Sequence, residues 1–194
     1  MDQPIMDLAD QLAPLERFAV AYAPAAARAA WIGLFAFEQR LADTAKPGRD
    51  ALMIQLRLAW WRDRMAQEAA LWPRGEPLLA GLQVWDAERP ALGALVDGYE
   101  ARHVGEDGGA ELAQARIEAF VALGRLSGVS DPGPIRGSVA QWLDPDPAAP
   151  MPRLPRPMRP LAILAGMARR QARGLPATGL RGFGAALRLG LTGR

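Results

Sequence analysis

The chain has 194 residues, of which half are hydrophobic and 23% are charged, a balance typical of a folded globular protein rather than a disordered one. It contains no cysteine, which excludes disulfides and thiolate metal sites. His103 is its sole histidine, so any site that needs two imidazoles is also excluded. A chain of this length fits one domain, and we expect residues 1–194 to form it.

The formal net charge of +2 conceals an uneven distribution along the chain. Residues 1–146 carry 14 basic and 21 acidic side chains, whereas residues 147–194 carry nine arginines and no acidic residue. This basic segment can dock on the acidic body, lie solvated on a helix, or face an anionic lipid, a diphosphate or a protein partner. Nucleic acid is an unlikely partner, because Phe183 is the only aromatic residue of the segment and base stacking needs more.

No apolar run approaches the 18 residues or so that a membrane span requires. The longest near-candidate, residues 18–37, is interrupted by Pro24 and Arg28. The first residues lack the charged, apolar and small-residue order of a signal peptide. We therefore expect a cytoplasmic protein that can associate peripherally with the inner membrane.

Alanine, leucine and arginine dominate the chain, and all three favour helices, whereas alternating strand patterns are nearly missing. The sequence therefore predicts an all-α fold. Residues 1–13 are expected to be a loosely held lead-in, and residues 144–157, with six prolines, a loop without regular helix. The predicted helices span residues 15–22, 25–44, 49–71, 77–85, 90–103, 110–127, 135–143, 158–173 and 179–190.

The second and third predicted helices should form an antiparallel pair, because the break at residues 45–48 is too short for another arrangement. Residues 25–44 carry no charge between Arg28 and Glu38, so this helix should be buried nearly all round. In residues 49–71, four large apolar side chains recur at the helical interval: Ile54, Leu58, Trp61 and Met65. The rings expected to be buried are Trp31, Phe35 and Trp61.

Three stretches carry a family resemblance, and together they cover about half the chain. The first joins Leu34-Phe-Ala-Phe-Glu-Gln-Arg-Leu-Ala-Asp-Thr44 to Leu56-Arg-Leu-Ala-Trp-Trp-Arg-Asp63. The others are Leu95-Val-Asp-Gly-Tyr-Glu-Ala101 and Leu154-Pro-Arg-Pro-Met-Arg-Pro-Leu-Ala-Ile-Leu164. In this order they resemble the squalene/phytoene synthase family, and the Trp-Trp stretch is the most specific of them.

The resemblance implies an isoprenoid-synthase-like bundle of helices around an apolar cavity. In active relatives, two aspartate-rich motifs on facing helices hold Mg²⁺ against a prenyl diphosphate. The metal ions neutralise the departing diphosphate, and each of them needs several oxygen ligands. The apolar cavity then shields the allylic cation from water.

This chain departs from the family at both motifs. The first falls on residues 42–46, where Asp43 is the only carboxylate, and Arg40 and Lys46 place positive charge where a cation would bind. The helix that bears the second motif should follow residues 124–128, but prolines interrupt the chain there. We therefore expect a truncated bundle. The sequence Asp144-Pro-Asp146 is more typical of a turn than of a metal site.

The resemblance implies ligand-binding roles for five residues: Trp31, Phe35, Arg57, Trp60 and Trp61. The alternative for the tryptophan pair is core packing, and for the arginines of that helix solvation or ion pairing. Asp43 and Asp97 are candidate relics of the metal motifs, although Asp97 can instead pair with a nearby arginine. We expect no catalytic residue and no metal site, and we assign His103 no chemistry.

Three functions are compatible with this sequence. The first is a catalytically degenerate accessory or assembly factor, which resembles the mitochondrial branch of the family regarded as an assembly factor for respiratory complex I. The second is a carrier of isoprenoids or lipids. The third is an active prenyl-diphosphate transferase, completed by a partner chain, and only this alternative requires Mg²⁺. Residues 158–194 are the expected contact with a protein partner or an anionic membrane surface.

Overall fold

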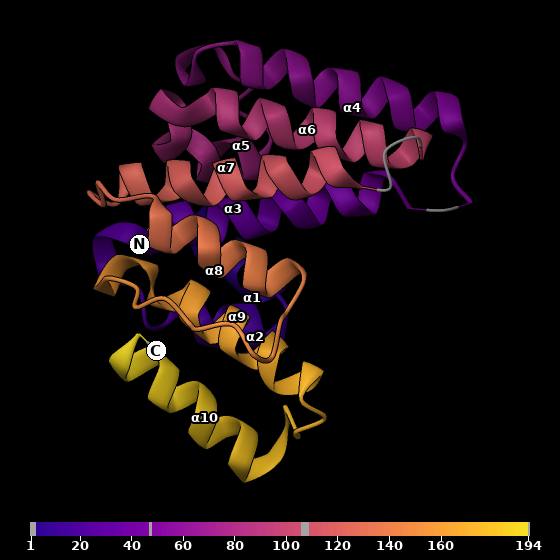
Figure 1. Ribbon diagram of the computed structural model, residues 1–194. Helices are drawn as coiled ribbons and strands as arrows, with labels where there is room; N and C mark the ends of the chain where they lie inside the picture. Colours follow the sequence, from indigo (N-terminus) through magenta and orange to yellow (C-terminus); the bar gives the residue numbers. More distant parts are fainter. Residues whose placement is uncertain (1–2, 47, 106–108, 194) are drawn as a thin grey trace. The chain divides into compact units, whose positions relative to one another are not determined.

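A computed structural model describes residues 3–46, 48–105 and 109–193 (Figure 1). All regular secondary structure in these ranges is helical, which confirms the all-α prediction. The chain divides into two compact units. Unit 1 comprises Met1–Leu12 with Ala29–Ala122, and unit 2 comprises Ala13–Arg28 with Leu123–Arg194. The expectation of a single domain stays a prediction.

The observed elements follow the predicted order closely. The α-helices are α1 (Gln3–Gln11), α2 (Pro14–Val20), α3 (Ala25–Thr44), α4 (Ala51–Ala66), α5 (Pro77–Leu82), α6 (Arg89–Val104), α7 (Ala110–Leu126), α8 (Gly133–Leu143), α9 (Arg159–Ala172) and α10 (Gly179–Thr192). Short 3₁₀ turns occupy Ala69–Leu71, Gln83–Glu88 and Arg156–Met158. The proline-rich segment, predicted as a loop, has no α-helix.

The helix predicted over residues 49–71 is shorter than expected, because specific contacts determine both of its ends. The Asp50 side chain caps the first turn of α4 by accepting a hydrogen bond from the Met53 amide at 3.0 Å. At the other end the chain becomes extended at Gln67. The Trp72 indole then folds back and donates to the Arg64 carbonyl at 2.7 Å, which satisfies a carbonyl of the last turn.

The N-terminal residues differ from the loosely held lead-in that the sequence suggested. Residues 3–11 form α1, which packs against α5. Ile5 and Leu8 of α1 are buried, and so is Leu12, which follows the helix directly. The spacing of three and four residues between these side chains makes an apolar stripe, and burying it supplies the free energy that holds this segment in place.

The core of unit 1 is built around aromatic rings. Trp31 and Phe35 of α3 are buried, and their ring centroids lie 5.6 and 6.2 Å from that of Phe120 of α7. Phe37 of α3 meets Trp61 of α4 edge to face, with 5.2 Å between centroids. The predicted burial of Trp31, Phe35 and Trp61 is therefore confirmed.

The contacts of α3 and α4 run in opposite chain order. Thr44, at the end of α3, lines the same recess as Ile54 near the start of α4, whereas Phe37 meets the later Trp61. The predicted antiparallel pair is confirmed. The buried face of α4 is the predicted one, and α4 packs along α6, beside which it lies in Figure 1.

Unit 2 is organised around α9, which is the most deeply buried of its helices and packs against α2, α8 and α10. Gly166 allows the closest approach of α10, since a Cβ at that position would stand 2.6 Å from a methyl carbon of Leu189. Among the described residues, no helix has both the length and the apolar character needed to cross a membrane.

Replacing Phe120 by alanine should lower the free energy of unfolding by about 3–5 kcal/mol, because it leaves a cavity between Trp31 and Phe35. Leu52→Ala is the matched control: this leucine is 62% exposed, and its loss should cost less than about 0.5 kcal/mol. Chemical denaturation followed by far-ultraviolet circular dichroism measures both values. Equal losses in the two variants would contradict the aromatic core described above.

Candidate functional site

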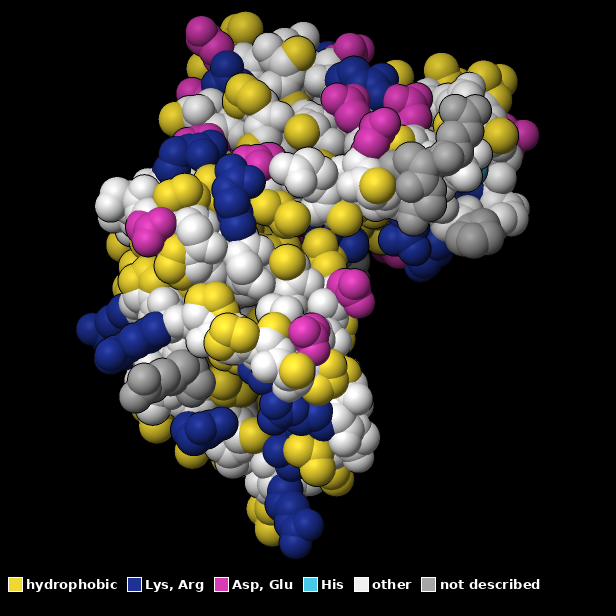
Figure 2. Space-filling view, viewed as in Figure 1, with side chains coloured by type: hydrophobic (Ala, Val, Ile, Leu, Met, Phe, Trp, Pro, Cys, Tyr) yellow, Lys and Arg dark blue, Asp and Glu magenta, His cyan; other side chains and the backbone are white. Residues whose placement is uncertain are grey.

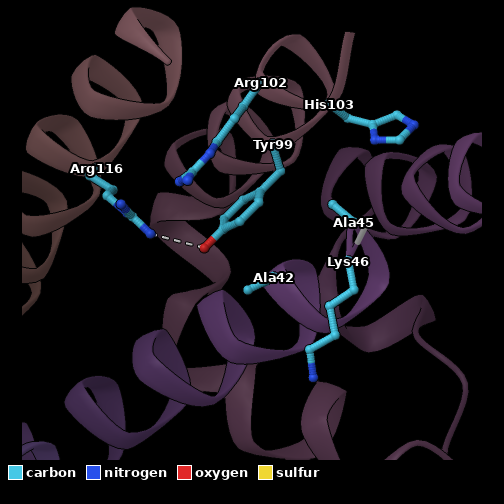
Figure 3. Close-up of a pocket in the computed structure, with 7 residues that line it drawn as sticks. All are labelled: Ala42, Ala45, Lys46, Tyr99, Arg102, His103 and Arg116. Carbon is cyan, nitrogen blue, oxygen red and sulfur yellow. Dashed lines mark hydrogen bonds between the residues drawn. The ribbon is translucent and has the colours of Figure 1, made fainter. Parts of the chain in front are cut away.

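A pocket of about 500 Å³ lies at the end of α3 and includes residues of the segment 42–46, on which the family resemblance puts its first aspartate-rich motif. Its walls come from three helices of unit 1 (Figure 3). The lining residues are Ala42 in the last turn of α3, Ala45 and Lys46 just after it, Tyr99, Arg102 and His103 on α6, and Arg116 on α7. We call this the basic pocket, because its described lining contains cationic side chains and no carboxylate.

The geometry of the basic pocket depends on a close approach of α6 and α7. Gly98 makes this approach possible, since a Cβ there would lie 2.8 Å from the Cα of Leu112. The next residue, Tyr99, is buried, and its hydroxyl accepts a hydrogen bond from Nη2 of Arg116 at 3.0 Å. The Arg116 guanidinium also lies 5.7 Å from the centre of the Tyr99 ring.

A buried carboxylate holds Arg116 in this position. Oε1 of Glu38, on α3, accepts a hydrogen bond from Nε of Arg116 at 2.7 Å. Burial lowers the pKa of Arg116, but the charge of Glu38 and the bonds to Tyr99 outweigh it, so the pKa is raised overall. Burial raises the pKa of the Tyr99 hydroxyl, and Glu38 adds to this shift, while Arg116 and Arg102 act in the opposite direction. Arg116 therefore stays charged and Tyr99 stays protonated at neutral pH.

Positive charge remains in the pocket after the ion pairs among the described residues are counted. Arg116 is paired with Glu38, and Nζ of Lys46 lies 2.6 Å from Oδ1 of Asp43. Arg102 forms no ion pair among the described residues. Figure 3 shows the guanidinium groups of Arg102 and Arg116 on the same side of the Tyr99 ring, with His103 pointing away. Two guanidinium groups at one site suit a phosphate or diphosphate.

The carboxylates expected as relics of the metal motifs bond to basic side chains instead. Asp43 bonds to Lys46, and Oδ1 of Asp97 accepts from Nε of Arg62 at 2.7 Å. Glu100 also bonds to Arg62, so the alternative of ion pairing for Asp97 is confirmed. No group of three or more histidine, aspartate or glutamate side chains that could hold a metal occurs among the described residues. This donor set does not fit Mg²⁺, which requires oxygen ligands in octahedral array.

In unit 2, the pair Asp144 and Asp146 has the turn structure that its prolines indicate. Asp144 ends α8, and Oδ1 of Asp146 accepts a hydrogen bond from the Ala148 amide at 2.8 Å. Such a bond from a side chain to the amide two residues on is typical of an Asx turn.

The five residues to which the resemblance assigns ligand binding do not gather in one place. Trp31, Phe35 and Trp61 lie in the aromatic core of unit 1. Trp60 is 38% exposed, stands edge-on to Trp61, and has the Arg64 guanidinium 5.6 Å from its ring centre. Arg57 lines a separate recess of about 200 Å³ with Thr44 and Asp50. None of the five lines the basic pocket, and their role in ligand binding stays a prediction.

The sequence did carry a signal for the residues that do form the pocket. Arg116 lies four residues after Leu112 and four before Phe120, both of which are buried, so it occupies an inward-facing position of α7. A charged residue at such a position requires a buried partner. Glu38 ends the uncharged run of α3 and is that partner.

Comparison of the chain with protein-family models, with curated proteins and with solved structures gave no match.

Replacing Glu38 by leucine should lower the free energy of unfolding by about 3 kcal/mol, because it leaves the Arg116 charge buried without its carboxylate. The double variant Glu38→Leu/Arg116→Met should recover most of this loss, since no unpaired charge remains. Thermal and denaturant unfolding of the three proteins measures the effect.

Asp43→Asn serves as the control for a surface ion pair. Both Asp43 and Lys46 are well exposed, so the loss should stay below about 0.5 kcal/mol. A double variant of Glu38 and Arg116 that is no more stable than Glu38→Leu would mean that the charge of Arg116 is not the source of the loss.

Proposed function

We propose that this chain is a catalytically degenerate relative of the squalene/phytoene synthase family that acts as an accessory, assembly or isoprenoid- or lipid-binding factor at a membrane surface. Three stretches of sequence and the all-α fold support the relationship. The basic pocket beside Asp43 is the observation that supports a binding role without catalysis. It presents cationic side chains at the place where, by the resemblance, active relatives hold metal ions.

The chemistry of the pocket suits direct binding of an anionic group. In an active relative, Mg²⁺ bridges carboxylates to the diphosphate; here Arg102 and Arg116 can donate to phosphate oxygens without a metal. The volume of about 500 Å³ fits a small ligand or the head of a larger one. Ala42, Ala45 and the Tyr99 ring add apolar surface for the first carbons of an isoprenoid or lipid chain.

The same pocket argues against the alternative of an active prenyl-diphosphate transferase. Ionisation of an allylic diphosphate needs metal ions that stabilise the negative charge developing on the departing diphosphate. Here Asp43, the single carboxylate of residues 42–46, is already bonded to Lys46 and is not free to hold such an ion. A partner chain would have to supply the missing carboxylates. With Mg²⁺ and farnesyl or geranylgeranyl diphosphate, we expect no release of diphosphate above background. Turnover that disappears in Asp43→Asn would establish the transferase instead.

We expect farnesyl diphosphate and inorganic diphosphate to bind equally well in EDTA and in Mg²⁺, because guanidinium groups rather than metal ions hold the anion. Lys46→Gln/Arg102→Gln should weaken binding by about tenfold or more, since both side chains lie at the pocket and removing them spares the Glu38–Arg116 pair. Isothermal titration calorimetry measures the affinities.

Arg74→Gln/Arg156→Gln removes the same charge from exposed positions outside the pocket and should bind like the wild type. An equal loss of affinity in both double variants would show that only the net charge of the chain matters. Binding that requires Mg²⁺ would contradict the proposal.

A further inference from the structure

The last helix, α10, exposes large apolar side chains to solvent. Leu180 is 91% exposed, Leu191 59%, Phe183 56% and Leu187 38%. At about 100° per residue, these four positions share an arc of about 80° on the circumference of the helix. We call them the outer stripe. Scattered apolar residues are ordinary on a protein surface, but four on one helical face form a patch that suits a contact.

The outer stripe is distinct from the face by which α10 is held in unit 2. On its buried face, Gly182, Ala186, Leu189 and Gly190 are covered. Leu189 packs at Gly166 of α9, and Gly190 lies under the ring of Tyr22, which follows α2. Phe183, at the margin of the stripe, also lies near Phe18, with 5.7 Å between ring centroids. Because α10 is anchored by its other face, the stripe can be occupied without unfolding the helix.

Arginines border the outer stripe. Arg181 and Arg188 follow it directly on the circumference of α10. Arg188 also lines a recess of about 250 Å³ between α9 and α10, which we call the arginine recess. Arg169, Arg170 and Arg173 of the neighbouring helix and turn complete its charged lining. Over α9 and α10, Figure 2 shows dark blue and yellow side chains interspersed.

The arginine recess is preorganised by backbone carbonyl groups, and among the described residues no carboxylate neutralises it. Arg169 donates to the Pro147 carbonyl at 2.7 Å and Arg173 donates to the same oxygen, while Arg170 donates to the Pro176 carbonyl at 2.6 Å. These bonds orient the guanidinium groups but supply no full negative charge. None of the described arginines between residues 153 and 188 pairs with a carboxylate among the described residues.

We infer that α10 lies in the interface of an anionic lipid bilayer, with the outer stripe entering the acyl boundary and the arginine recess receiving a headgroup phosphate. The combination of an apolar stripe with flanking arginines is the pattern of helices that lie flat in such an interface. A second copy of the chain fits less well, because it would bring the same arginines together. The inference rests on the proposed place at a membrane surface and is independent of the basic pocket.

The first experiment is co-sedimentation of the full chain with vesicles of phosphatidylglycerol and phosphatidylcholine, or of phosphatidylcholine alone. We expect binding to the anionic vesicles that weakens as salt is raised, and little binding to the neutral ones. Leu180→Ser/Leu187→Ser/Leu191→Ser should reduce the partition coefficient about tenfold or more. Arg181→Gln/Arg188→Gln should reduce it too, and should also flatten the salt dependence.

Exposed leucines of α4 provide the control for the outer stripe, both as substituted residues and as a labelling position. Leu52→Ser/Leu56→Ser is the matched control, because both leucines are more than half exposed on α4 of unit 1, and it should bind as the wild type does. The chain has no cysteine, so Leu180→Cys can carry a single polarity-sensitive fluorophore. Its emission should rise and shift to the blue with anionic vesicles, whereas a label at Leu52→Cys should not respond.

Several outcomes would overturn the inference. These are equal sedimentation of the wild type and the leucine variant of α10, equal binding to both kinds of vesicle, and no binding at all. Self-association without lipid, abolished by the same leucine substitutions, would assign the outer stripe to a second copy. Leu180→Ser/Leu187→Ser/Leu191→Ser lies outside the basic pocket and should bind inorganic diphosphate as the wild type does, so failure of vesicle binding is distinguishable from failure of diphosphate binding.

Discussion

The buried ion pair between Glu38 and Arg116 is the constraint on which the rest of unit 1 depends. It joins α3 to α7 through the buried carboxylate of Glu38 and the part-buried guanidinium of Arg116, and the Glu38 charge without its partner would be strongly unfavourable. Tyr99 of α6 completes the arrangement by accepting from the same guanidinium group. Three helices are thereby fixed at one point. The basic pocket opens beside it, so the position of its lining follows from the pair.

Both proposals concern positive charge that the described chain leaves without a carboxylate. In unit 1 this charge is concentrated at Arg102 and next to Arg116, in a pocket large enough for a small anion. In unit 2 it lies in the arginine recess, whose side chains are oriented by carbonyl groups rather than neutralised. A carbonyl dipole fixes the direction of a guanidinium group but leaves most of its charge available, so an external anion still gains from binding.

The helical pattern was readable because it depends on neighbours three and four residues apart. The interval of Ile54, Leu58 and Trp61 predicted the buried face of α4, and the uncharged run of α3 predicted its burial. The sequence did not predict the conformation of segments that are held by contacts with residues distant in the chain. Residues 3–11 are helical because α5 covers their apolar stripe, and the shape of the chain after α4 is set by the return of Trp72.

By itself the sequence determined the all-α class and the aromatic residues Trp31, Phe35 and Trp61 of the core, because both follow from local pattern and composition. Only the tertiary structure decided which charges meet. Glu38 and Arg116 are 78 residues apart, and Arg62 and Asp97 are 35 apart, so no local interval relates them. The two faces of α10 likewise differ only in what covers them: both are apolar in sequence, and packing against α9 and Tyr22 leaves just one exposed.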